Sequence, residues 1–137
     1  MLSHILIIPD GNRRWAREKG KSFSEVYKQV ALETTPMAIK HLLLKKGISE
    51  ITVFMLSKNN LIMRDKKELE SICDAQIAAY ELFGTDREMM MNNLQFNFFG
   101  GSSALPEKYA HAMRKLSELT KNNQGPKCNF LVAYDAQ

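Results

Sequence analysis

The sequence has little cysteine, no long hydrophobic run and no leader-like start. Its two cysteines, Cys73 and Cys128, match no zinc-binding spacing, so we expect them to be reduced and buried as small apolar side chains. The longest uninterrupted apolar stretch is only a handful of residues, so the sequence predicts no membrane span. Met1 to Pro9 carries neither a basic leader nor a small-residue cleavage site, so we predict no signal peptide and a cytoplasmic protein.

A strong excess of charge of one sign is also missing. The 19 Lys and Arg residues outweigh the 15 Asp and Glu residues by a formal net charge of +4, which suits a small anion as well as nucleic acid. A nucleic-acid binder usually shows a basic stripe with interleaved aromatic residues, but only the short pairs Arg13-Arg14 and Lys45-Lys46 are present. We therefore predict that nucleic acid is not a partner.

The composition, with 45% apolar and 25% charged residues, is that of an ordinary globular protein. No repeat, linker or charge block divides the chain, so we predict one domain over residues 1–137. The predicted strands are Ile5–Ile8, Ile51–Leu56, Leu94–Phe99 and Cys128–Tyr134, and segments with helical patterns lie between them. This alternation predicts an α/β fold, a mainly parallel sheet flanked by helices, with the first strand buried on both faces.

The predicted helices span residues 13–19, 24–46, 65–83 and 106–121. Ser24 is the expected N-cap of the second helix, and Pro36 should kink or break it because proline lacks a backbone N–H. Asp65 and Glu68 have the spacing of a capping box at the start of the third helix, and Gly84 should end that helix.

Three loops follow the carboxyl ends of predicted strands, where parallel sheets bind their ligands. In the first, a helix N-terminus offers free N–H groups, Gly11 permits close approach, and Arg13 and Arg14 can hold phosphate oxygens. Asp10 would repel a phosphate unless a cation such as Mg²⁺ lay between them. The alternative is that Asp10 only caps the helix and the arginines are solvated.

The other loops are less informative. Residues 57–60 are polar and either donate hydrogen bonds into the same crevice or form an ordinary exposed turn. Residues 100–103 are glycine-rich but lack the lysine of a phosphate-binding P-loop, so we interpret them as structural. Tyr27, on the helix behind the first loop, could reach a bound anion or be a half-buried aromatic residue.

Several segments resemble the cis-prenyltransferase, or undecaprenyl diphosphate synthase, family. His4–Ala16 resembles the family's opening strand and its DGN-x-RWA diphosphate loop, and Ile51–Asn60 is similar to its second strand and FS-x-x-N signature. Gly100–Pro106 and Glu118–Tyr134 resemble later parts of the same fold. The resemblance implies an α/β fold with an apolar tunnel beside the sheet, isoprenoid diphosphate substrates, Mg²⁺ as cofactor and a homodimer.

The resemblance also assigns roles to single residues. Asp10 would hold Mg²⁺ and help to ionise the diphosphate, Asn60 would assist proton loss, and Ser57 matches the family's serine in the second loop. The remaining assignments are four ligands of the diphosphate, Gly11, Asn12, Arg13 and Arg14, and two residues of a hydrophobic substrate pocket, Trp15 and Phe54.

Departures from the family pattern favour its short-chain, irregular members. The usual Gly-His pair falls at Val26-Tyr27, an arginine ahead of it at Phe23, and the tryptophan and arginine after Asn60 at Leu61 and Met63. The pattern is similar to that of lavandulyl and cyclolavandulyl diphosphate synthases, which join two five-carbon dimethylallyl units. In such an enzyme Tyr27 would donate its phenol proton to a phosphate oxygen.

The family pattern normally continues past residue 137 with a second diphosphate site and a further acidic metal ligand, so we expect a C-terminally truncated sequence. The predicted activity is Mg²⁺-assisted condensation of short allylic diphosphates of the dimethylallyl and isopentenyl class, with irregular coupling as one form. The alternatives are a non-catalytic subunit of a cis-prenyltransferase complex and a regular short- or medium-chain cis-polyprenyl diphosphate synthase.

Overall fold

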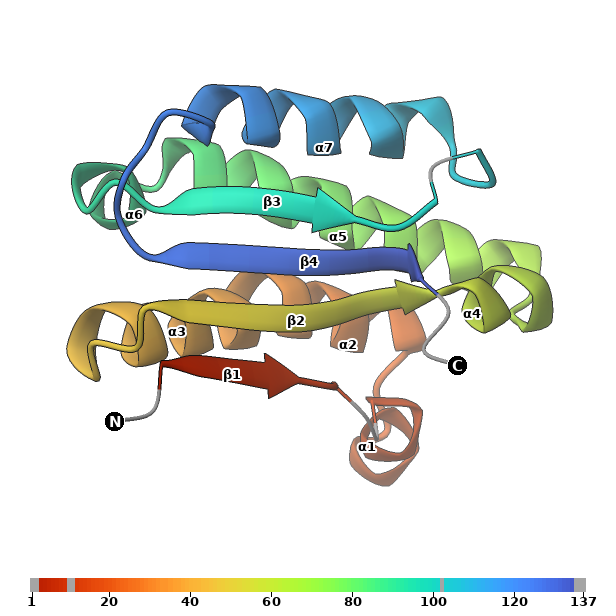
Figure 1. The fold of residues 1–137 in the computed structure, drawn as a ribbon. Helices are drawn as coiled ribbons and strands as arrows, with labels where there is room; N and C mark the ends of the chain where they lie inside the picture. The colour runs from red at the N-terminus through yellow and green to blue at the C-terminus, as the bar shows by residue number, and fades with distance from the viewer. Residues whose placement is uncertain (1–2, 10–11, 102, 135–137) are drawn as a thin grey trace.

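The computed structural model describes residues 3–9, 12–101 and 103–134, and its four described strands form one parallel sheet (Figure 1). The strands are β1 (His4–Ile7), β2 (Glu50–Ser57), β3 (Gln95–Phe99) and β4 (Lys127–Tyr134). They lie in the order β1-β2-β4-β3, so β4 pairs with both β2 and β3. The predicted α/β fold with a parallel sheet is confirmed.

Helices occupy most of the chain between the strands. They are α1 (Asn12–Lys19), α2 (Phe23–Gln29), the π-helix η1 (Val30–Thr34), α3 (Thr35–Ile39), the π-helix η2 (Lys40–Lys45), α4 (Lys58–Met63), α5 (Lys66–Thr85), α6 (Arg87–Met91) and α7 (Glu107–Thr120). In Figure 1, helices α2, α3 and α5 lie behind the sheet. None of the helices within the described ranges is long and apolar enough to cross a membrane.

The hydrophobic core lies between one face of the sheet and these helices. Alternate strand residues such as Ile51 and Val53 are buried with Ile39 of α3. The rings of Phe83, Phe96 and Phe130 stack with centroids 5.5 to 6.0 Å apart, which joins α5 to the two strands at the other side of the sheet. Cys73 and Cys128 are free and buried, as expected.

The prediction that the first strand is buried on both faces is wrong. Within the described sheet β1 is an edge strand that pairs with β2 alone, and its side chains alternate between exposed and half-buried. Leu6 is 57% exposed, and Ile8, just beyond the strand, is 65% exposed. A short apolar run does not distinguish a central strand from an edge strand, because strands of either kind can consist of a few consecutive apolar residues.

The second predicted helix begins earlier than expected and continues through Pro36. Ser22, not Ser24, is its N-cap, and Ser22 forms a capping box with Glu25. Helical structure then runs from Phe23 to Lys45, changing from α to π and back at η1 and α3. Pro36 lies in the first turn of α3, where the change from η1 accommodates its missing N–H, so the proline does not break the helix.

The third predicted helix also differs at both ends. Asp65 caps it by accepting from the N–H of Glu68, but the predicted capping box is wrong because the Glu68 side chain turns elsewhere. Helix α5 passes Gly84 and ends at Thr85. A Cβ at Gly84 would lie 3.3 Å from Cδ2 of Leu119, so this glycine permits close packing of α5 and α7 rather than ending the helix.

Candidate active site

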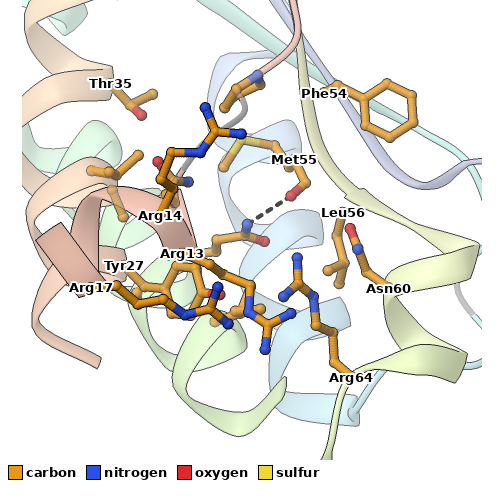
Figure 2. A pocket seen from close by; sticks show the side chains of 17 residues that line it. Arg13, Arg14, Arg17, Tyr27, Thr35, Phe54, Met55, Leu56, Asn60 and Arg64 are labelled. Atoms are coloured by element: carbon orange, nitrogen blue, oxygen red, sulfur yellow. Dashed lines mark hydrogen bonds between the residues drawn. The ribbon is translucent and has the colours of Figure 1, made fainter. Parts of the chain in front are cut away.

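A cavity of about 330 Å³ opens near the carboxyl ends of β1 and β2 (Figure 2). Its polar part is lined by Asn12, Arg13, Arg14, Arg17, Asn60 and Arg64. Its apolar part is lined mainly by Val30, Ala31, Met55, Leu56, Ile72 and Ala75. The cavity therefore combines a cationic end, suited to an anionic group, with an apolar wall between the sheet and helices η1 and α5.

Two helices that follow strands place the polar side chains. Helix α1 begins at Asn12 shortly after β1, so its first turns carry Arg13 and Arg14 into the cavity. Ser57 ends β2 and caps α4: its hydroxyl accepts from the N–H of Asn60 at 3.0 Å, and the Asn60 side chain accepts from the N–H of Ser57 at 3.3 Å. This reciprocal pair fixes the position of Asn60 at the cavity wall.

One buried carboxylate connects the cationic residues. Oε1 of Glu68 accepts from the Tyr27 hydroxyl at 2.7 Å and from Nη1 of Arg64 at 3.0 Å, and it lies 3.3 Å from Nε of Arg13. The Glu68 side chain is only 5% exposed. A buried carboxylate is stable only when paired and hydrogen-bonded, so these contacts hold α1, α2 and the end of α4 against α5.

Burial and the same carboxylate together keep Tyr27 protonated. Burial, followed by the hydrogen bond to Glu68 and its negative charge, raises the pKa of Tyr27 from 10.0 to about 12. The phenol is therefore neutral near pH 7. Its single proton points to Glu68, whereas the role expected from the sequence has it donated to a phosphate oxygen.

The Prenyltransf family model, which describes the undecaprenyl diphosphate synthase family, matches residues 8–137. This chain belongs to that family. It is 33% identical over 134 residues to isoprenyl transferase of Streptococcus pneumoniae, a match covering 96% of this chain and 50% of the relative. It is 35% identical over 134 residues to a tritrans,polycis-undecaprenyl-diphosphate synthase (geranylgeranyl-diphosphate specific) of Pyrobaculum aerophilum, covering 96% and 55%. The chain thus spans about half the length of these curated relatives.

A solved crystal structure shares the fold. Lavandulyl diphosphate synthase from Lavandula x intermedia, in complex with dimethylallyl diphosphate, superposes with a TM-score of 0.82 at 26% identity. The match covers 96% of this chain and 55% of the other. The family resemblance seen in the sequence motifs is therefore confirmed.

In this chain, most of the described residues that the motifs single out lie together. Asn12, Arg13, Arg14, Tyr27, Phe54 and Asn60 all line the cavity. Ser57 acts one step away, as the cap that fixes Asn60. Trp15 lines a neighbouring hollow, which it shares with Asn12 and Arg14. Asp10 and Gly11 lie outside the described residues.

The motif comparison misses several residues of the site, among them Arg17, Arg64, Glu68 and Gln76. It places Met63 at the family's arginine position, but Met63 is 73% exposed and the next residue, Arg64, lines the cavity. Glu68 follows Arg64 by four positions, and this spacing of opposite charges is the local signal that could have revealed both, although Arg64 itself has extended backbone ahead of α5. Gln76 leaves no such signal, although it lines the cavity and donates to the carbonyl of Met55 at 3.0 Å.

The described residues alone do not form a metal site. No group of three or more His, Cys, Asp or Glu side chains lies close enough together to hold a metal ion in the ranges 3–9, 12–101 and 103–134. Glu68 is already engaged by Tyr27 and two arginines. The cationic cavity therefore suits a metal ion only when the ion arrives with, or beside, a strongly anionic ligand.

Proposed function

We propose that this chain carries the allylic diphosphate site of a cis-prenyltransferase. The observation that supports this most directly is the cavity itself, in which four arginines of the described lining meet an apolar wall. Guanidinium groups bind phosphate oxygens bidentately, and an apolar wall suits an isoprenoid chain. Together they match the two halves of an allylic diphosphate.

The proposed reaction breaks the allylic C–O bond. The diphosphate leaves with the bonding electron pair, the C=C bond of a second isoprenoid attacks the allylic cation, and a proton then leaves the new carbon skeleton. Arg13, Arg14 and Arg64 would stabilise the negative charge that develops on the leaving group. Apolar residues such as Ile72 and Ala75 would exclude water from the cation.

Magnesium fits this proposal through the ligand and one residue of the chain. Asp10, which lies outside the described residues, would hold the ion, and the cationic lining attracts the diphosphate that shares it. When bound, Mg²⁺ would add charge neutralisation at the leaving group. The family model and the similar Pyrobaculum aerophilum protein are both named as diphosphate synthases. A diphosphate is the class of ligand that this arrangement of Asp10 and arginines requires.

We further propose short substrates of the dimethylallyl and isopentenyl class. The similar lavandulyl diphosphate synthase was solved with dimethylallyl diphosphate, and a cavity of about 330 Å³ is of a size for a short chain. Irregular coupling of two dimethylallyl units, a homodimer and a cytoplasmic location complete the proposal. A second copy would cover exposed apolar residues of the edge strand, such as Leu6.

Product analysis tests this function. The protein is incubated with Mg²⁺ and dimethylallyl diphosphate, with and without isopentenyl diphosphate, and the released alcohols are identified by mass spectrometry. A product from dimethylallyl diphosphate alone would indicate irregular coupling, and one that requires isopentenyl diphosphate would indicate regular coupling. Asp10→Ala should lower product formation by orders of magnitude. The matched control Arg87→Gln, on α6 and outside the cavity lining, should have no effect.

Absence of any product from the wild-type protein would contradict the catalytic proposal. If the wild-type protein then still bound dimethylallyl thiolodiphosphate, the non-catalytic subunit would become the better interpretation. If it bound neither this analogue nor inorganic pyrophosphate, the diphosphate site itself would be refuted.

A further inference from the structure

Glu68 has a geometry that the family motifs do not assign. A single oxygen of its carboxylate, Oε1, contacts a donor from each of three segments: Arg13 on α1, Tyr27 on α2 and Arg64 at the end of α4. Glu68 itself belongs to α5. The side chain is 5% exposed, whereas that of Arg13 is 44% exposed and that of Arg64 23% exposed. Glu68 therefore holds the buried side of the Arg13 and Arg64 guanidinium groups, and both arginines also line the cavity.

We propose that Glu68 is the positioning residue of the diphosphate site. It orients the guanidinium groups of Arg13 and Arg64 before the ligand binds. This inference rests on the proposed function, because it concerns the same ligand. Glu68 would not touch the substrate and is not a catalytic residue.

The atoms used in these contacts support a positioning role. Arg13 faces Glu68 through Nε and Arg64 through Nη1, so neither contact uses the whole guanidinium fork. Because a guanidinium group is planar and rigid, the nitrogen that contacts Glu68 also fixes the direction of the remaining N–H groups. Figure 2 shows Arg13 and Arg64 side by side at the lower end of the cavity, with Tyr27 to the left of them.

Charge supports the same role. Two guanidinium groups that approach one oxygen atom would repel each other without the negative charge between them. The lining contains four arginines, Arg13, Arg14, Arg17 and Arg64, so removal of Glu68 increases its positive charge. A variant without this charge should still attract a diphosphate, yet hold it in less defined geometry. Binding and turnover are therefore expected to separate.

The decisive variant is Glu68→Gln, with Glu70→Gln as matched control on the exposed side of the same helix. Binding of inorganic pyrophosphate with Mg²⁺ is measured by the fluorescence of Trp15, the single tryptophan. Product formation is measured under saturating substrate. For Glu68→Gln we expect pyrophosphate affinity equal to or higher than wild type and a kcat lower by about 10- to 100-fold, the loss typical of misplaced reacting groups. Glu70→Gln should match wild type in both.

A second variant covers the case in which Glu68→Gln does not fold. Glu68→Asp keeps the charge but withdraws the carboxylate by one methylene, so kcat should again fall about tenfold or more. Wild-type kcat in either folded variant would overturn the positioning role. So would a fall in pyrophosphate affinity that accounts for the whole loss of activity. Wild-type protein that fails to bind pyrophosphate would instead refute the proposed function, and with it this inference.

Discussion

The hydroxyl of Tyr27 donates to Oε1 of Glu68 at 2.7 Å and thereby joins α2 to α5 across 41 positions of sequence. This contact is part of the group of buried contacts around Glu68 that position the arginines of the cavity. It links Tyr27 to a carboxylate that also contacts two arginines.

Tyr27→Phe should alter how stability depends on alkaline pH. Because the pKa of Tyr27 is raised from 10.0 to about 12, the unfolded phenol loses its proton in this window while the folded one keeps it. Its contribution to stability is complete below pH 10 and is lost as the pH rises to about 12. Urea unfolding of both proteins across this range should show a smaller loss of unfolding free energy in the variant. Parallel pH curves would contradict the assignment, since other titrating groups are common to both proteins.

Arg64→Gln should weaken pyrophosphate binding by about 10- to 100-fold, because a charge-assisted hydrogen bond contributes about 1.5 to 3 kcal/mol. Met63→Gln is the matched control, since Met63 is adjacent in sequence but 73% exposed and outside the lining. Titration of Trp15 fluorescence with pyrophosphate and Mg²⁺ measures both. A larger effect at Met63 than at Arg64 would restore the motif-based alignment and refute the placement of Arg64.

Ala75→Leu should increase the preference of the cavity for short over long allylic chains. Ala75 is 2% exposed and lines the apolar wall, so a larger side chain there fills part of the cavity. Binding of the ten-carbon geranyl thiolodiphosphate should weaken more than binding of the five-carbon dimethylallyl analogue. Ala78→Leu, on the same helix but outside the lining, should leave the ratio of the two affinities unchanged. Equal loss of both analogues in Ala75→Leu would show that the chain does not run along this wall.

Gly100→Ala should destabilise the fold by about 1 to 3 kcal/mol or more. Gly100 has a φ of +132°, and a Cβ there would clash with the carbonyl oxygen of Val132, which is backbone and cannot turn away. Gly84→Ala is the control: its Cβ would meet two side-chain ends, Cδ2 of Leu119 at 3.3 Å and Cδ1 of Leu116 at 3.7 Å, and no backbone atom, and alanine favours the helix. Its unfolding free energy should fall less than that of Gly100→Ala, because a leucine side chain can shift where backbone cannot. Thermal unfolding of the two variants distinguishes these outcomes.

The sequence predicts the order of the four strands and of the four longest helical segments because apolar runs and turn residues act locally, but it does not predict the short helices α4 and α6. It does not distinguish the exposed edge strand β1 from a buried one, since burial depends on which elements pack beside it. Pro36 misleads for a related reason: a change of helix type keeps the segment helical where the residue alone predicts a break.

The candidate site is predictable where a motif is contiguous. Arg13 and Arg14 follow a strand directly, and their placement in the cavity agrees with that pattern. Glu68 is misread because it stands three positions after Asp65, the same spacing as a capping box. Its true partners lie on other elements, at sequence distances that no local pattern reports.

The position of β4 has a consequence for biosynthesis. Although it is the last described strand to leave the ribosome, it lies between β2 and β3, and in the described sheet β3 pairs with no other strand. The nascent chain can pair β1 with β2 early. Phe96 of β3 becomes enclosed only after Phe130 has been synthesised and β4 has paired with β3. A translation pause or a nonsense codon ahead of Lys127 would thus leave an apolar half-sheet exposed to chaperones and proteases.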